Sequence, residues 1–283
     1  AWSSKPVKGG MLSPCSRLRE GKLMNTSPER KGPLSRFTIL DASRVRAGPT
    51  AIRTFADLGA RVIKLEIPPG APGGDDMIGG RDHNRADYEN LHRNKESLTL
   101  NMKEPKGKAI LEQLVKEADV FIENYKVGDM ARYGLDYDTL ALLNPKLVYC
   151  SITGFGQTGP YRHRAGYDFA IQGMGGLMSI TGERDELGGS PQKAGIAVAD
   201  LFTGMYATVA ILAALRHAAQ TGEGQHIDMA LLDTQVAVIA NLGANYLVSG
   251  QHNGTVPTRA GNAHQNLVPY QVFEVAPADD GSQ

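Results

Sequence analysis

One carboxylate, that of Asp168, stands where a glycine-rich turn meets a predicted helix. A β-branched, apolar run at 147–153 leads into the turn GFGQTGP at 154–160, and an apolar segment rich in small residues follows Asp168. A strand that ends in a Gly/Pro loop and presents a carboxylate is a common way for an α/β enzyme to hold a reacting group. The ordinary alternative is an N-cap, because aspartate is a preferred residue at the start of a helix.

The elements around Asp168 predict a parallel sheet covered by helices. Short β-branched runs alternate with helical apolar patterns, as in strands joined by right-handed crossovers. The predicted strands lie at 37–41, 61–66, 97–101, 119–123, 147–153 and 224–228, and the predicted helices at 47–60, 104–117, 137–144, 197–218 and 229–247. We therefore expect an α/β fold, with a Rossmann-like large domain over 34–195 and long helices over 196–283 that lead to a second, incomplete small domain.

Composition favours an ordinary globular protein. The chain has 283 residues, 41% of them hydrophobic, and a formal net charge of zero, so neither a nucleic-acid nor a membrane partner is predicted. No apolar run is long enough to span a bilayer, and the most apolar stretch, 207–215, fits a buried helix. The two cysteines, Cys15 and Cys150, form no metal or redox motif, which makes the cytoplasm the default compartment.

The first 33 residues differ from the rest. They hold seven Lys/Arg against two Glu and show no sustained periodicity, which favours a disordered leader or translated upstream sequence, with Met24 as the true start. A targeting peptide is the alternative. The first predicted turn carries no G-x-G-x-x-G, which disfavours a nicotinamide-dependent dehydrogenase.

The sequence around Asp168 resembles the central signature of the class III CoA-transferases of the CaiB/BaiF type, which include formyl-CoA and succinyl-CoA transferases. SITGFGQTGPY, AGYD and IQGMGGLMSITG carry the resemblance, which runs in order from about Phe37 to Phe273. The run AGNAHQNLVPYQVF at 260–273 is similar to the succinyl-CoA-dependent dicarboxylate members. The resemblance implies that Asp168 attacks an acyl-CoA thioester and that CoA passes to a small carboxylic acid through an aspartyl anhydride. It implies a CoA thioester as substrate, no permanently bound cofactor and no metal.

The same resemblance implies further site residues. By this resemblance, Gly261 is a catalytic residue on a loop that closes over the nucleophile. The residues implied in CoA binding are Arg46, Ala47, Asn94, Lys95, Asn124, Tyr125 and Arg132. Ordinary alternatives are a solvated loop charge for Arg46, core packing for Tyr125 and a helix-terminal charge for Arg132. Where the family often has a CoA-contacting arginine this chain has Ile67, and Arg81 is a candidate replacement.

Two other functions stay open. An α-methylacyl-CoA racemase of the same family deprotonates the α-carbon with a His–Asp pair, but here Tyr167 stands where the histidine is expected, although Asp200 matches the second acid. A catalytically silent fragment is the other alternative, because family members continue beyond the point that corresponds to Gln283. The resemblance also implies an interlocked homodimer.

Overall fold

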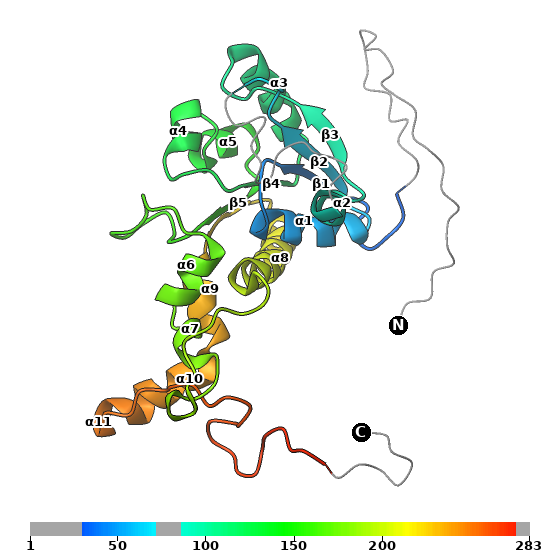
Figure 1. Ribbon diagram of the computed structural model, residues 1–283. Coiled ribbons are helices and arrows are strands. Elements are labelled where there is room, and N and C mark those ends of the chain that lie inside the picture. The colour runs from blue at the N-terminus through cyan, green and yellow to red at the C-terminus, as the bar shows by residue number, and fades with distance from the viewer. Residues whose placement is uncertain (1–29, 72–85, 276–283) are drawn as a thin grey trace, which may run out of the picture.

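The computed structural model describes residues 30–71 and 86–275 and contains one six-stranded parallel sheet (Figure 1). Its strand order is β3-β2-β1-β4-β5-β6, which is the doubly wound Rossmann order and confirms the predicted α/β fold. The strands are β1 (Thr38–Asp41), β2 (Arg61–Glu66), β3 (Glu96–Thr99), β4 (Val120–Glu123), β5 (Val148–Thr153) and β6 (His226–Ala230). Residues 1–29 of the predicted leader (1–33) and Arg81 lie outside the described residues.

Helices cover both faces of the sheet because its central strands are apolar on both sides. On β1, Ile39 packs in one core cluster with α1 (Ala47–Asp57) and α8 (Val198–Thr221), while its neighbour Leu40 packs in the other. The second cluster contains residues of α3 (Pro105–Val115), α4 (Asp129–Tyr133) and α5 (Tyr137–Leu143). The shorter helices are α2 (Ala86–His92), α6 (Asp168–Met174), α7 (Leu177–Ile180) and a 3-10 turn (Asp185–Leu187).

Helix α8 lies against α1 at a close approach that requires glycine. A Cβ built on Gly204 would lie 2.8 Å from the carbonyl oxygen of Ala47 and 2.9 Å from Cβ of Thr50. With 24 residues and a mean hydropathy of 1.7, α8 is long and apolar enough to cross a membrane, contrary to the sequence-based expectation. Helix α8 packs against α1 and contributes residues to the apolar core, as the core helix of a globular protein does.

The predicted helix at 229–247 is wrong in its extent. Strand β6 continues to Ala230, and shorter elements follow: α9 (Leu231–Val238), α10 (Ala240–Asn245), a π-helical turn (Tyr246–Gly250) and α11 (Gln251–Asn253). At Ile239 the backbone leaves the helical region, with ψ at 21°. Asn241, Gly243 and Asn245 are poor helix formers, and α10 buries no residue that could offset this.

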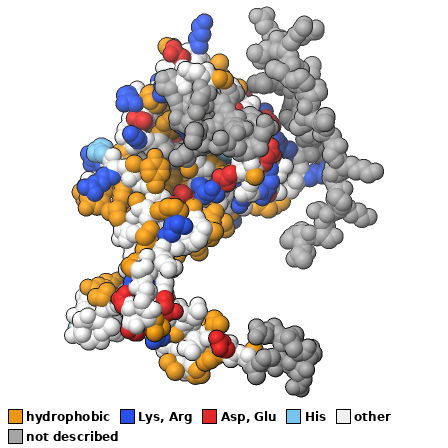
Figure 2. Space-filling model, viewed as in Figure 1, with side chains coloured by type: hydrophobic (Ala, Val, Ile, Leu, Met, Phe, Trp, Pro, Cys, Tyr) orange, Lys and Arg blue, Asp and Glu red, His pale blue; other side chains and the backbone are white. Residues whose placement is uncertain are grey.

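Residues beyond α9 form an arm that projects from the sheet (Figure 1). The arm holds α10, α11 and an irregular segment with one short antiparallel bridge, between Ala263 and Gln271. Most of its side chains are exposed, and Figure 2 shows hydrophobic groups among them. The predicted division into domains at 34–195 and 196–283 stays a prediction. The core cluster that contains Ile39 also includes Ile211 and Leu231, which lie beyond residue 195.

Candidate active site

A cavity of about 720 Å³ lies at the carboxyl ends of β1, β4 and β5. It opens where the chain order of the sheet reverses, between β1 and β4, which is where doubly wound folds bind their ligands. Among the residues that line it are Arg46, Ala47, Asn124, Tyr125, Tyr167, Asp168 and Asp200. Residues predicted from distant parts of the sequence therefore meet in one hollow.

The Asp168 carboxylate is buried, at 7% exposure, and is held at both oxygens. Gln172 donates its side-chain amide N–H to Oδ1 at 2.5 Å, and the backbone N–H of Asp200 donates to Oδ2 at 2.9 Å. Tyr167, not Asp168, is the N-cap of α6, and no side-chain bond caps that helix. The N-cap alternative is therefore wrong for α6, because Asp168 instead satisfies an N–H in the first turn of α8.

Gln172 is a site residue that sequence reasoning missed. Its side chain is fully buried, and its oxygen accepts the N–H of Ala194 at 2.8 Å. Its amide nitrogen also lies 3.3 Å from the carbonyl of Ile196. The available signal was spacing, since residues four apart on a helix lie on the same face. Gln172 thereby ties the orientation of Asp168 to the segment that precedes α8.

A second carboxyl, that of Asp200, lies beside the first. Burial and the negative charge of Asp168 raise the pKa of Asp200 to about 6, while the charge of Arg46 and the backbone N–H of Ala47 act in the opposite direction. The N-terminus of α8 favours negative charge at this point. The site therefore combines one firmly held carboxylate with a second carboxyl whose charge changes in the mildly acidic range.

The loop after β1 forms another wall of the cavity. Asn124 clamps it across the switch point: its oxygen accepts the N–H of Arg44 at 2.8 Å, and its nitrogen donates to the Arg44 carbonyl at 2.7 Å. Val45 has a φ of 67°, an outlier for a β-branched residue. Arg46 pairs with Asp87 at 2.8 Å. The clamp on Arg44 holds a strained turn at the cavity wall.

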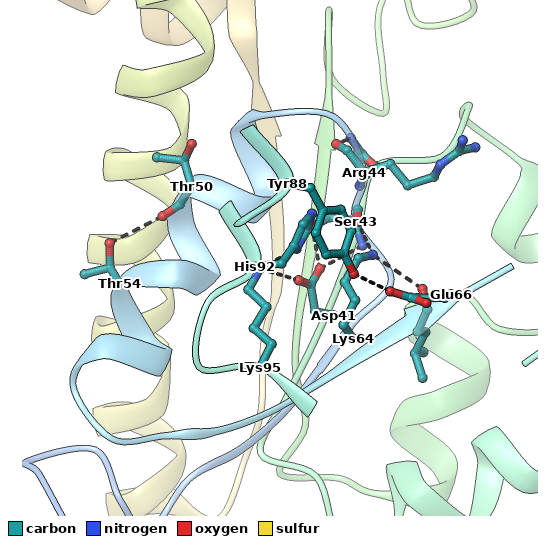
Figure 3. Close-up of polar contacts among 12 residues, drawn as sticks. Asp41, Ser43, Arg44, Thr50, Thr54, Lys64, Glu66, Tyr88, His92 and Lys95 are labelled. Atoms are coloured by element: carbon teal, nitrogen blue, oxygen red, sulfur yellow. Dashed lines mark hydrogen bonds and ion pairs between the residues drawn. The ribbon is translucent and has the colours of Figure 1, made fainter. Parts of the chain in front are cut away.

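Lys95 lies in a buried cluster of charges behind this loop (Figure 3). Its ammonium pairs with Asp41 at 2.8 Å, and both side chains are at most 1% exposed. Asp41 also accepts the N–H and hydroxyl of Ser43, whose carbonyl accepts from Lys64 at 2.6 Å. Burial alone would raise the pKa of Asp41, but Lys95 and Lys64 hold it well below its ordinary value. Lys95 is thus engaged in a buried ion pair and is not among the residues that line the cavity.

Two other predicted CoA contacts also lie outside the cavity lining. Asn94 is exposed, with a φ of 63°, and donates to the carboxylate of Asp57 at 3.0 Å. Arg132 is exposed and pairs with Asp129 at 2.9 Å. Their contact with CoA stays a prediction.

Gly261 lies on the arm, where it packs against the turn at 182–183. It has a φ of 61°, and a Cβ there would lie 2.4 Å from the Glu183 carboxylate, which explains the glycine. Its N–H donates to the carbonyl of Gly182 at 3.1 Å and is therefore occupied in this arrangement. Its closure over the nucleophile stays a prediction.

The charges of the cavity suit an anionic ligand. Cationic side chains on three loops line it: Arg44, Arg46, Lys126, Arg162 and Arg164. Guanidinium groups bind phosphate and carboxylate oxygens in pairs, and several cations in one hollow raise the local concentration of an anion. Within residues 30–71 and 86–275, no group of three or more His, Cys, Asp or Glu is arranged to hold a metal ion.

Comparison with known proteins identifies the family. The family model described as CoA-transferase family III matches residues 34–280. The chain is 53% identical over 268 residues to the succinate–glutarate CoA-transferase of Agrobacterium fabrum, covering 91% of this chain and 64% of that protein. It is 44% identical over 245 residues to the human succinyl-CoA:glutarate CoA-transferase, covering 86% of this chain and 54% of that protein. The chain thus spans about half to two thirds of these relatives.

A solved structure agrees with this assignment. A CaiB/BaiF family protein from Brucella suis superposes with a TM-score of 0.74 at 48% identity, covering 88% of this chain and 65% of the other. Rv3272 from Mycobacterium tuberculosis superposes with a TM-score of 0.67 at 30% identity, covering 77% of this chain and 58% of the other. The chain belongs to CoA-transferase family III.

Proposed function

We propose that this chain carries the CoA pocket and the nucleophile of a transferase that moves CoA from succinyl-CoA to a small dicarboxylic acid. The observation that supports it most is the Asp168 carboxylate, buried and held at both oxygens on the wall of a cation-lined cavity. The names of the similar proteins add succinyl-CoA as donor and glutarate as one acceptor. A CoA thioester is the substrate in this account and no resident cofactor is required.

The reaction proceeds by acyl transfer to Asp168. A carboxylate oxygen attacks the thioester carbonyl, the C–S bond breaks, and CoA leaves as thiolate from a mixed anhydride. The thiolate then attacks the aspartyl carbonyl, which releases succinate and leaves an aspartyl-CoA thioester. The acceptor carboxylate displaces CoA to form a second anhydride, and the thiolate attacks its acyl carbonyl. This last step gives the new acyl-CoA and restores the Asp168 carboxylate.

The structure supports a nucleophile fixed before the substrate arrives. A carboxylate is weakly nucleophilic, so its rate depends on orientation and on exclusion of water. Gln172 and the Asp200 N–H fix the carboxylate plane through side chain and backbone. The adjacent α8 N-terminus stabilises the negative charge that returns to Asp168 when the anhydride is cleaved.

The racemase alternative has one supporting observation, the paired carboxyls of Asp168 and Asp200. Against it, Tyr167 occupies the position before the nucleophile, where the racemase signature has a histidine, so the imidazole of the proton relay is missing. Incubation with a branched acyl-CoA in deuterated water distinguishes the two reactions. Racemase chemistry introduces deuterium at the α-carbon, whereas transferase chemistry does not.

We further propose a homodimer in the cytoplasm. One face of α8 exposes large apolar side chains although the opposite face is in the core: Phe202, Met205, Tyr206 and Val209. A contiguous apolar surface of this kind is typical of an interface. The buried free thiol of Cys150 suits a reducing compartment. Light scattering at two concentrations tests the dimer, and a monomer at both would contradict it.

The transfer assay uses succinyl-CoA with a panel of dicarboxylic acids, followed by mass spectrometry of the CoA thioesters. The Agrobacterium relative serves as positive control and Asp168→Asn as negative control. We expect a new acyl-CoA from the chain and none from the variant. CoA binding without any product would favour the silent fragment, and absence of CoA binding would refute the proposal.

A further inference from the structure

Lys64 is a buried cation outside the cavity lining. It lies in β2, is 6% exposed and is the register partner of Asp41 on β1. Its ammonium donates to the Ser43 carbonyl at 2.6 Å and lies 3.4 Å from the carbonyl of Leu65 (Figure 3). The ion pair with the Asp41 carboxylate is formed by Lys95. The ammonium of Lys64 is therefore directed at backbone oxygens.

Ser43 lies two residues after the end of β1 and is held by two buried charged side chains. The residue is fully buried. Its N–H and its hydroxyl donate to the Asp41 carboxylate at 3.0 and 2.5 Å, and its carbonyl accepts from Lys64. In the part of the chain that the structure describes, no backbone N–H donates to this carbonyl. Lys64 therefore satisfies a buried acceptor whose desolvation would otherwise destabilise the turn.

The position of Ser43 determines the position of the neighbouring cavity wall. Arg44 follows it directly, with its backbone clamped by Asn124 and its side chain turned away from the buried cluster (Figure 3). A Cβ on Gly48, in the first turn of α1, would lie 2.3 Å from Cβ of Ser43, so the start of the helix packs directly on this residue. Residues 44–47, which lie between, all line the cavity. A shift of Ser43 would therefore move both cations of this loop, Arg44 and Arg46.

The loop needs a strong restraint because its backbone is strained. Val45 has a φ of 67°, a conformation that persists only where the surroundings enforce it. A hydrogen bond from a charged donor is stronger than one from a neutral donor. The buried ammonium of Lys64 meets this need on one side of Val45, as the Asn124 clamp does on the Arg44 backbone.

We propose that Lys64 is a positioning residue for the cavity: its ammonium holds the Ser43 carbonyl and thereby places the guanidinium groups of Arg44 and Arg46. Lys64 acts through the loop and not by contact with a ligand. The restraint on the loop concerns the described residues alone. Only its effect on CoA affinity rests on the proposed function.

The first test is amide hydrogen exchange of the free protein, followed by mass spectrometry. Lys64→Met keeps the length of the side chain and removes the donor. Peptides from β4 and β5 measure any change caused by global destabilisation. Beyond that change, we expect the peptide that covers residues 43–48 to exchange about tenfold faster than in wild type, because the bond that holds the loop is lost.

Lys95→Met is the matched control, because it removes a buried cation from the same carboxylate but no bond to Ser43. Here the peptide 43–48 should exchange at most about twofold faster than the sheet peptides account for. Equal acceleration in the two variants, or an unchanged peptide in Lys64→Met, would overturn the proposal. If Lys64→Met does not fold, both variants are compared in combination with Asp41→Asn, which removes the unpaired buried charge.

The second test is a double-mutant cycle on the Kd of free CoA, measured by calorimetry. Lys64→Met should raise the Kd about tenfold in the wild-type background. In a background that already carries Arg44→Met and Arg46→Met, it should raise the Kd less than about twofold, because the groups that it positions are absent. An equal rise in both backgrounds would refute the positioning role.

Lys126→Met provides the control background, since Lys126 lines the cavity on a different loop. There the effect of Lys64→Met should remain about tenfold, because the two residues act independently. Loss of the effect in this background as well would refute the specific link to Arg44 and Arg46. If wild type binds no CoA, the proposed function fails, while the exchange measurement still decides whether Lys64 holds the loop.

Discussion

The ion pair between Asp41 and Lys95 is the contact whose loss should be most costly outside the cavity. We predict that Lys95→Met, which keeps the length of the side chain but removes its charge, destabilises the fold while leaving the cavity lining intact. The two side chains are at most 1% exposed, so water cannot replace the lost partner. Asp41 then remains as a buried carboxylate with one cation fewer.

The structure sets the expected size of this loss in the free energy of unfolding. Breaking a buried pair by removing one partner typically costs about 3–5 kcal/mol. Asp41 keeps the two bonds from Ser43 and the nearby charge of Lys64, which places the loss at the lower end, about 3 kcal/mol. For a domain of this size, that corresponds to a fall in Tm of about 6–12 °C.

The assay is urea and thermal unfolding without ligand, with Lys126→Met as the matched control. Lys126 is exposed and lines the cavity, so its loss should change stability by less than about 0.5 kcal/mol but weaken CoA binding. Adding Asp41→Asn to Lys95→Met should recover part of the lost stability, because no unpaired charge remains buried.

A different result would refute this reasoning. If Lys95→Met is as stable as wild type but binds CoA more weakly, then Lys95 is a phosphate ligand, as the family resemblance implied. The burial of the pair would then not describe the state that binds CoA.

Three further predictions concern the nucleophile and the helix beneath it. Gln172→Leu removes a bond to the carboxylate of Asp168 and should slow acylation about tenfold to a hundredfold in stopped-flow measurements; an unchanged rate would exclude a positioning role. The folded-state pKa of Asp200 is raised to about 6, so ionisation of this carboxyl destabilises the fold. This loss of stability is absent below the unfolded-state pKa and is complete once the pH has risen through 6. Asp200→Asn should therefore lose less stability than wild type between about pH 4 and 7 in urea unfolding, and an equal loss would contradict the shift. Gly204→Ala should destabilise the protein by about 1–3 kcal/mol, whereas the open site at Gly243 should accept alanine without loss in the same assay.

The sheet could be predicted because its four central strands are short, largely buried and rich in β-branched residues. The predicted second strand coincides with β2, and the strand that leads to the central turn differs from β5 by one residue. Arg46, Asn124 and Asp168 could be grouped from the sequence because they follow strands, and the carboxyl ends of parallel strands meet at one edge.

The contacts of individual side chains could not be predicted in the same way. A lysine just before a predicted strand gives no indication that its partner is Asp41, so Lys95 was assigned to CoA binding. Gln172 is one helical turn from Asp168, but many such pairs have no function.

The long helix predicted after β6 failed for a related reason. Apolar composition over 229–247 indicated a buried helix, but a helix needs a surface to pack against as well as apolar residues. Beyond Ile239 the chain leaves the core, and α10 has no buried residue. The break at this position therefore reflects the poor helix preference of the residues after Ile239 together with the absence of packing that could offset it.

Trapping of the acyl-enzyme tests the central claim most directly. The chain is incubated with succinyl-CoA, quenched with hydroxylamine and digested, and the peptide that contains Asp168 is analysed by mass spectrometry beside the same peptide from Asp168→Asn. The account predicts a hydroxamate on Asp168 in the wild type and none in the variant. A chain that binds succinyl-CoA and carries no modification at Asp168, while the Agrobacterium relative is modified under the same conditions, would contradict it.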